Sequence, residues 1–181
     1  MRLCLSKRRV KMSKTKPFRV LGLDLSLTSP GFAIVEVKNG NPRLIKTANF
    51  TTDSSTAQAL RYEEIEAFTL LFIRENKPFD VIAREIWPPS RNYAQNNKIH
   101  GCWAAVERAL SRYGYEVGEH LTPSNVKKTV TGNGSAKKPE VAEHVRKILG
   151  LGEDYKFDSD DHSDAAAIAL AYLIREGLIK K

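Results

Sequence analysis

The stretch from Phe18 to Gly31, FRVLGLDLSLTSPG, constrains the fold of this chain more than any other segment. An apolar run ends abruptly at Asp24, and a turn rich in serine, threonine and proline separates it from a second apolar run that begins at Phe32. This order predicts a buried strand, an acid at its end, a turn and a second strand. A carboxylate at the end of a buried strand loses most of its hydration, so it stays ionised only beside a cation or hydrogen-bond donors. Asp24 is therefore either a turn-capping residue or a metal ligand.

The composition favours one domain with a real core, since the chain has 181 residues of which 41% are hydrophobic. It contains no apolar run near the roughly 20 residues that cross a bilayer, and its first residues are too few for a signal-peptide core. We therefore expect a protein of the cytoplasm, in a bacterium or a phage-infected cell. The two cysteines, Cys4 and Cys102, lack metal-ligand spacing, so neither a zinc site nor a disulfide framework is predicted.

The net charge of +8 comes from the beginning of the chain. Residues 1–19 hold eight of the 29 lysines and arginines and no acid, which leaves 21 basic and 21 acidic residues elsewhere. We expect residues 1–17 to form a basic, disordered tail that binds a polyanion, followed by one folded domain over 18–181. The alternatives are a solvated leader, an organellar targeting peptide and an upstream extension before a start at Met12.

Hydrophobic periodicity predicts an α/β fold with three successive antiparallel strands followed by two further strands, with helices between them. An Asn-Gly turn joins the second and third strands, and a fourth strand that is apolar on both faces ends in Glu85. The first expected helix covers the sheet with an apolar stripe of Leu60, Ile65, Phe68, Leu71 and Phe72. The expected strands are 20–24, 31–38, 43–51, 79–86 and 115–121, and the expected helices are 54–76, 92–113, a short one after Thr122-Pro123, 139–149 and a last one that begins within 158–164.

Carboxylates come from three separate segments: Asp24, Glu85 and the pair Asp161 and Asp164. The pair shares one helical face, because positions i and i+3 are neighbours. Capping of the last helix is the alternative for Asp161 and the acids before it, and a cap or surface role is the alternative for His162. If the strand ends meet and the last helix packs on them, four carboxylates converge, and one like-charged pair about 4 Å apart costs on the order of 4 kcal/mol. Such an oxygen-only set selects Mg²⁺ or Mn²⁺, and two such ions can displace an alkoxide from phosphate.

Four segments in order resemble the RuvC family of Holliday-junction resolvases: LGLDLSLTSPGFAIV, VIAREI, TPSNVKKTVTGNGSAKKPEVAEHV and DHSDAAAIALAYL. The resemblance covers about residues 18–175. It implies an RNase H-like fold, with a central mixed five-stranded sheet of three antiparallel and then parallel strands flanked by helices. It further implies a homodimer that nicks four-way DNA junctions with two Mg²⁺ ions per site, for which Mn²⁺ substitutes. The implied metal ligands are Asp24, Glu85, Asp161 and Asp164.

The resemblance also implies residues that contact DNA. Lys127 and Lys138 match the family's basic residues near the scissile phosphate, and a solvated surface is the alternative role. An aromatic wedge is often placed where this chain has Pro88, and the bacterial members usually have proline where this chain has Leu25. The basic tail lies outside the family pattern, which indicates a phage or otherwise divergent member. The full set of expected DNA contacts is Lys127, Lys138, Lys137, Lys128, Trp87, Arg91 and Tyr93, of which Trp87 and then Tyr93 are candidates for the wedge, with a core or dimer contact as the alternative.

The expected helix over 92–113 is a candidate for the dimer interface, because an apolar stripe is flanked by small residues. The alternative is that this stripe packs on the chain's own sheet. Two other functions fit the same residues: cleavage of flaps or replication forks, and junction binding without catalysis. The sequence does not tell whether a branch-migration helicase is a partner. The stripe consists of Ile99, Cys102, Trp103, Val106 and Leu110, and the small residues are Gly101, Ala104 and Ala105.

Overall fold

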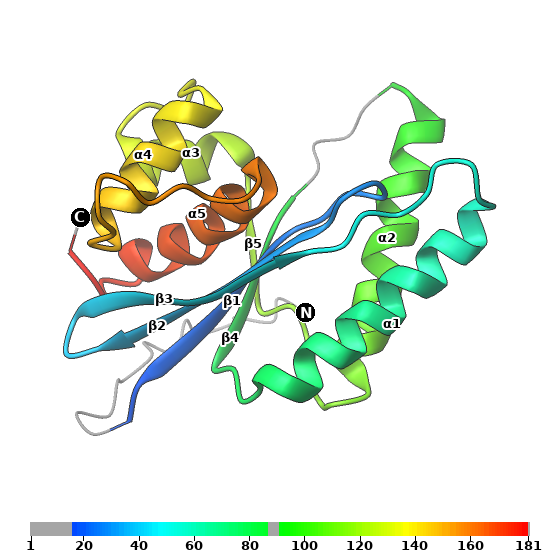
Figure 1. Ribbon diagram of the computed structural model, residues 1–181, viewed down its shortest axis with the longest axis horizontal. Coiled ribbons are helices and arrows are strands. Elements are labelled where there is room, and N and C mark those ends of the chain that lie inside the picture. The colour runs from blue at the N-terminus through cyan, green and yellow to red at the C-terminus, as the bar shows by residue number, and fades with distance from the viewer. Residues whose placement is uncertain (1–15, 87–90, 181) are drawn as a thin grey trace, which may run out of the picture.

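A twisted five-stranded sheet separates two layers of helices in the computed structural model, which describes residues 16–86 and 91–180 (Figure 1). The strand order is β3-β2-β1-β4-β5, with β1, β2 and β3 antiparallel and β4 and β5 parallel to β1. The predicted mixed sheet is therefore confirmed. The predicted tail, except its last two residues, and Trp87 lie outside the described residues. The strands are β1 (Phe18–Asp24), β2 (Gly31–Lys38), β3 (Asn41–Asn49), β4 (Val81–Glu85) and β5 (Glu119–Leu121).

The helices are divided unequally between the two faces of the sheet (Figure 1). One face carries α1 (Gln58–Asn76) and α2 (Tyr93–Ser111). The other face carries α5 (Asp160–Arg175), against which α3 (Pro123–Thr131) and α4 (Lys138–Ile148) pack. The sheet therefore has a separate hydrophobic core on each side.

Most element boundaries fall within a few residues of the prediction, and local hydrogen bonds explain the differences. Asn39 and Gly40 both have positive φ, so the hairpin closes over two residues and β3 begins at Asn41 rather than at residue 43. Before α1, Asp53 Oδ1 accepts from the backbone N–H of Ser55 at 2.8 Å, and this turn delays the helix to Gln58.

The side chains of α5 are buried along most of the helix, in keeping with its run of alanines. Glycines in the sheet allow this close approach. A Cβ atom on Gly22 would overlap the carbonyl oxygen of Ala165, and one on Gly31 would overlap that of Asp161. The backbone of α5 therefore lies directly on β1 and β2, which fixes the position of its acids relative to the strand ends.

The predicted apolar stripe of α1 is wrong at two positions, because Leu60 and Leu71 are about half exposed. Phe68 and Phe72 of the predicted stripe do pack on the sheet, and their rings lie 5.3 and 5.2 Å from that of Phe32 on β2. The stripe differs because α1 packs against α2 as well as on the sheet.

The apolar stripe from which the α2 dimer interface was predicted is largely buried within this same chain, and the interface itself stays a prediction. Cys102, Val106 and Leu110 are fully buried in the core of this same chain, and so is the flanking Ala105. A Cβ atom on Gly101 would overlap the ring of Tyr62 on α1, so Gly101 serves contact between two helices of one chain. The apolar stripe of α2 therefore packs against the chain's own sheet and α1.

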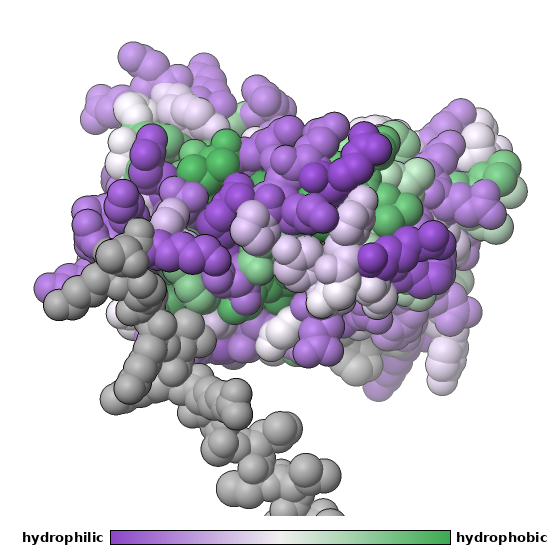
Figure 2. All heavy atoms as spheres, turned by 90° about the horizontal axis from the view of Figure 1, so that it is seen from below, coloured by the Kyte–Doolittle hydropathy of each residue, from purple (hydrophilic) through white to green (hydrophobic). Residues whose placement is uncertain are grey.

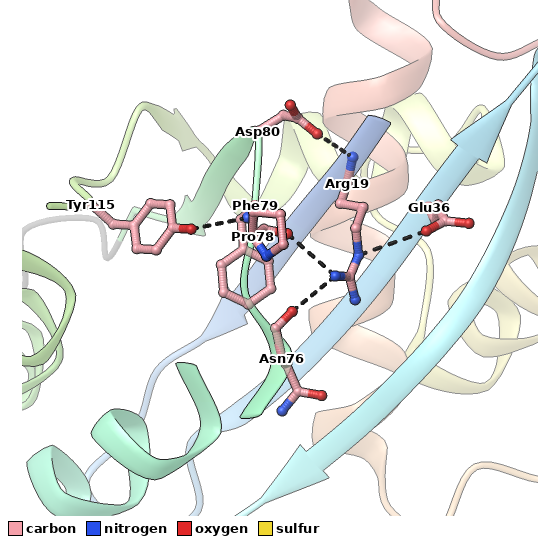
Figure 3. Close-up of polar contacts among 7 residues, drawn as sticks. All are labelled: Arg19, Glu36, Asn76, Pro78, Phe79, Asp80 and Tyr115. Carbon is pink, nitrogen blue, oxygen red and sulfur yellow. Dashed lines mark hydrogen bonds and ion pairs between the residues drawn. The ribbon is translucent and has the colours of Figure 1, made fainter. Parts of the chain in front are cut away.

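Arg19 fixes the end of β1 that lies opposite Asp24 (Figure 3). Its backbone N–H donates to Asp80 Oδ2 at 2.8 Å, and its Nη1 donates to the carbonyl oxygens of Asn76 and Pro78 at 2.9 and 3.3 Å. These contacts join β1 to the connection between α1 and β4. The two parallel strands are therefore aligned, which places their other ends side by side.

The surface is mainly polar, and Figure 2 shows hydrophilic side chains over most of the face seen from below, with apolar residues in small areas between them. A search of the described helices finds none with the length and hydrophobicity to span a membrane.

Candidate active site

Three predicted acids meet where β1, β4 and α5 come together. Asp24 ends β1, and Glu85 ends the adjacent parallel strand β4. Since Leu23 pairs with Arg84, the two acids that follow lie next to each other at the same edge of the sheet. Asp164 approaches from the second turn of α5. The three carboxylates line one cavity of about 170 Å³, together with Pro123, Val126, Lys127, Lys138, Val141 and Ala167.

Asp161, the fourth predicted acid, does not line this cavity. Its Oδ2 accepts a hydrogen bond of 2.7 Å from Ser29 Oγ, in the loop between β1 and β2. It still lies close enough to contribute to the raised pKa of Asp24. Asp161 therefore stands at the rim of the site, and its role as a metal ligand stays a prediction.

Burial and neighbouring negative charges raise the pKa of each carboxylate in the cavity. Burial raises the pKa of Asp24 to about 7, and the charges of Asp164 and Asp161 add to the effect. Burial also raises the pKa of Glu85 to about 7, with contributions from Asp24 and Asp164. The pKa of Asp164 is raised by burial as well, although its hydrogen bond from Lys138 opposes the shift. The site is thus short of positive charge.

Lysines supply part of the missing positive charge. Lys138 Nζ lies 2.9 Å from Asp164 Oδ2 and 3.8 Å from Asp160 Oδ2. Lys127 lies in the same cavity and lowers the raised pKa of Glu85. The other two predicted lysines, Lys128 and Lys137, are exposed and do not line the cavity.

The donor set fits a hard divalent cation. Among residues 16–86 and 91–180, no three His, Cys, Asp or Glu side chains already surround one point closely enough to hold an ion. Instead, the ammonium of Lys138 forms an ion pair with the carboxylate of Asp164. Oxygen-only ligands with unneutralised charge are those that Mg²⁺ and Mn²⁺ prefer, so Asp24, Glu85 and Asp164 suit such an ion once the Lys138 contact is released.

A second, larger cavity adjoins the first and was not predicted. It measures about 270 Å³ and shares Asp24 and Glu85 with the smaller cavity. Gln95, Lys98 and Trp103 of α2 line its outer wall. Gln95 and Lys98 are three residues apart and so lie on one face of a helix, which is the signal in the sequence, but it does not show that this face of α2 meets the strand ends.

The predicted residues near α2 lie at the surface. Arg91 and Tyr93 are exposed just before and at the start of the helix, and 81% of Tyr93 is accessible. Trp103 packs against a cation, because the Arg84 guanidinium lies 4.0 Å from its ring centroid. Arg84 is itself buried and pairs with Glu107 at 2.6 Å.

Arg61 of α1 holds the loop that follows Asp24. Its Nε donates to Thr52 Oγ1 at 2.8 Å, and its Nη2 donates to the carbonyl oxygen of Leu27 at 3.3 Å. Thr52 Oγ1 donates to the same carbonyl at 2.6 Å. The guanidinium is buried, so this loop is tied to the α1 layer.

The first turn of α5 differs from the capping alternative. Its N-cap is Ser159, which makes no side-chain capping hydrogen bond, and Asp160 and Asp161 follow inside the helix. The interpretation of the acids as caps is therefore wrong. His162 is buried rather than a cap or surface group, because α5 turns it toward the end of β3, where Nε2 lies 3.2 Å from Asn49 Oδ1.

Comparison with known proteins agrees with this geometry. The family model described as crossover junction endodeoxyribonuclease RuvC matches residues 20–172. The RuvC of Campylobacter jejuni (strain RM1221) is 34% identical over 157 residues, covering 85% of this chain and 93% of the relative. The RuvC of Caldicellulosiruptor saccharolyticus is 30% identical over 157 residues, covering 86% and 92%.

Solved structures show the same similarity. Thermus thermophilus RuvC matches with a TM-score of 0.74 and 30% identity, covering 90% of this chain and 99% of that one. Its complex with a Holliday junction substrate matches with a TM-score of 0.76 and 31% identity, covering 90% and 98%. The fold is therefore RNase H-like, as the sequence predicted, and this chain belongs to the RuvC family of crossover junction endodeoxyribonucleases.

Proposed function

We propose that this protein is a structure-selective endonuclease that resolves four-way (Holliday) DNA junctions. The observation that carries the proposal is the convergence of Asp24, Glu85 and Asp164 with Lys127 and Lys138 in one cavity, in a chain of the RuvC family. The similar T. thermophilus RuvC has been solved with a Holliday junction substrate. A carboxylate cluster beside lysines suits a reaction in which phosphate must be bound and its charge neutralised.

Mg²⁺ is the proposed cofactor, with Mn²⁺ as a substitute and two ions per site. Asp24, Glu85 and Asp164 would hold the ions, with Asp161 as the fourth ligand. When bound, such ions lower the pKa of water to give a nucleophile and stabilise charge on the leaving oxygen. The requirement for cations is consistent with the raised pKa values of Asp24 and Glu85, since positive charge favours their ionised forms.

The basic residues would bind the substrate backbone. Lys127 faces the carboxylates from α3, so it can contact the phosphate being cut. Lys138 can do the same once Asp164 binds a cation, because its partner is then neutralised. Lys128 and Lys137 are exposed nearby and can contact flanking phosphates, which position the DNA without reading its sequence.

The start of α2 supplies a second DNA-facing surface. Lys98 and Gln95 border the larger cavity beside Asp24, and Arg91 and Tyr93 are exposed next to it in sequence. Lys98 and Arg91 can pair with phosphates, whereas the exposed ring of Tyr93 can stack on an unpaired base. Tyr93 is therefore the proposed wedge within the described residues.

Resolution of a junction requires two cuts related by a two-fold axis. A C2 homodimer supplies two sites with that symmetry, so we propose that the protein acts as a dimer. The interface must lie outside the buried stripe of α2, because Cys102, Ala105 and Val106 have no exposed surface.

Parallel cleavage assays test the function. We expect nicking of a synthetic four-way junction in Mg²⁺, little cleavage of flaps or linear duplex, and no cleavage in EDTA. Faster cleavage of flaps or forks would replace the proposal with a branched-DNA nuclease of looser preference. Tight junction binding without cleavage in Mg²⁺ or Mn²⁺ would instead indicate a binding protein that has lost catalysis.

A further inference from the structure

A chain of three hydrogen bonds ends on the carboxylate of Asp161. Ser29 Oγ lies 2.7 Å from Asp161 Oδ2, Asn49 Nδ2 lies 3.1 Å from Ser29 Oγ, and His162 Nε2 lies 3.2 Å from Asn49 Oδ1. Ser29 belongs to the loop after β1, Asn49 ends β3, and both aspartate and histidine belong to α5. Three elements distant in sequence thus meet at one acid.

The direction of each hydrogen bond follows from the chemistry of the acid. An ionised Asp161 only accepts, so the single hydroxyl proton of Ser29 must point to it. The oxygen of Ser29 can then only accept from Asn49, which must present its NH₂ group. The carbonyl oxygen of Asn49 consequently faces His162, which must carry its proton on Nε2. Every group in the chain therefore has one compatible orientation.

The far end of the chain is rigid. His162 is only 5% exposed, and its other ring nitrogen, Nδ1, is buried without a hydrogen-bond partner in the part of the chain that the structure describes. Asp158 Oδ2 lies 4.0 Å from that nitrogen. The packed imidazole cannot turn away easily, so it holds the amide of Asn49 in place.

These side chains form neither the β2–β3 ladder nor the N-cap of α5. Asn49 closes the β2–β3 ladder against Gly31 through its backbone, and the N-cap of α5 is Ser159 rather than a member of the chain. What Ser29, Asn49 and His162 share is instead a chain of hydrogen bonds that ends on the carboxylate of Asp161.

We infer that Ser29, Asn49 and His162 are positioning residues for Asp161. They hold its Oδ2, which leaves Oδ1 for a divalent cation, and this inference rests on the proposed metal-dependent function. Groups that hydrogen-bond to a metal ligand orient it, and their loss typically weakens metal affinity or activity by about 10–100-fold.

Substitution of Asn49 by aspartate gives the sharpest test. Asn49→Asp keeps the size and the acceptor facing His162, but it removes the donor to Ser29 and offers the Ser29 hydroxyl a competing carboxylate. Asn41→Asp makes the same chemical change at the exposed beginning of β3 and serves as the charge control. Ser29→Ala removes the bond to Asp161, whereas Ser29→Thr retains a hydroxyl and should restore it.

Mn²⁺ binding without DNA is measured by titration calorimetry, and the Mg²⁺ concentration for half-maximal cleavage is measured separately. We expect Asn49→Asp and Ser29→Ala to weaken Mn²⁺ binding by about 10–100-fold and to raise the Mg²⁺ requirement, with unchanged junction binding in EDTA. Asn41→Asp and Ser29→Thr should stay within about threefold of the unmodified protein on both measures.

The outcomes separate the inference from the proposed function. Unchanged Mn²⁺ affinity and Mg²⁺ requirement in folded Ser29→Ala overturn the positioning role while leaving the nuclease intact. If the unmodified protein neither binds Mn²⁺ nor cuts junctions, the proposed function fails and the positioning role fails with it. Should Asn49→Asp not fold, the comparison of Ser29→Ala with Ser29→Thr decides the matter.

Discussion

Lys138 Nζ lies 2.9 Å from Asp164 Oδ2, so an ammonium from α4 rests against an acid that shares its cavity with Asp24 and Glu85. The carboxyl group raises the pKa of Lys138, which therefore remains charged at neutral pH. The same ammonium would compete with a cation for Asp164 and would be free to serve a phosphate afterwards.

Lys138→Met should therefore affect metal binding and catalysis in opposite directions. Loss of the ammonium makes the cavity more negative, so Mn²⁺ affinity should rise or stay the same, while cleavage should fall by at least about 100-fold because phosphate charge is less well neutralised. Calorimetry and single-turnover nicking measure the two effects. Lys147→Met removes the same charge on α4, where Lys147 pairs with Glu143, and should change neither. Parallel loss of both properties in Lys138→Met would contradict this account.

Asp24→Asn should abolish cleavage, by about 1,000-fold or more, while junction binding persists, because it removes a proposed ligand without changing shape. The variant should also resist heat better than the unmodified protein at pH 8 without divalent cations. The folded pKa of Asp24, about 7, exceeds the ordinary value of 3.8, so the folded state loses stability as pH rises from about 4 through 7, and asparagine lacks this loss. Thermal melts at pH 5 and pH 8 check the sign. A lower melting temperature for the variant at pH 8 would point to a structural role.

Gly22→Ala should destabilise the fold by about 3 kcal/mol or more, because the new methyl group overlaps the carbonyl oxygen of Ala165. Gly152→Ala has open space around the added methyl group and should change the free energy of unfolding by no more than about 1 kcal/mol. Denaturant unfolding measures both. Equal stability of the two variants would mean that α5 can move away from β1 at little cost.

Ala105→Arg should unfold the protein whatever its oligomeric state, since Ala105 is fully buried and an unpaired guanidinium there has no partner. Ala104→Arg, one residue earlier and exposed, should change stability by no more than about 0.5 kcal/mol. Circular dichroism melts compare the two. A folded, monomeric Ala105→Arg protein would instead support the prediction that α2 forms the dimer interface.

Deletion of residues 2–16 should weaken binding to all DNA shapes alike. Removing one lysine or arginine from a phosphate makes the slope of log affinity against log salt shallower by about 0.9, so the slope should flatten while the preference for junctions remains. Fluorescence anisotropy across a salt series measures this slope. An unchanged slope would favour the targeting or upstream-start interpretation.

The sequence predicted the sheet well because its signals are local. The Asn-Gly turn, the apolar run before Asp24 and the double-sided apolar run before Glu85 each depend on neighbouring residues, and the structure contains all three elements. The convergence of Asp24, Glu85 and Asp164 was predicted on condition that the two strand ends are neighbours and the last helix packs on them, and the structure meets both conditions.

Contacts between distant segments could not be predicted in the same way. An apolar stripe on α2 fits a partner chain as well as the chain's own sheet, and only the three-dimensional packing of Tyr62 against Gly101 distinguishes them. Similarly, Ser29 and Asn49 are ordinary loop and strand-end residues until Asp161 is placed beside them.

Buried Arg61 has a consequence for how the protein accommodates DNA. The guanidinium satisfies its donors with the carbonyl oxygen of Leu27 and the hydroxyl of Thr52, so swinging the loop outward would strand a buried charge at a cost of several kcal/mol. Ser29 anchors the other side of the same loop to α5. A junction arm that enters the site therefore contacts a firmly held loop beside Asp24, so the DNA rather than this loop has to bend.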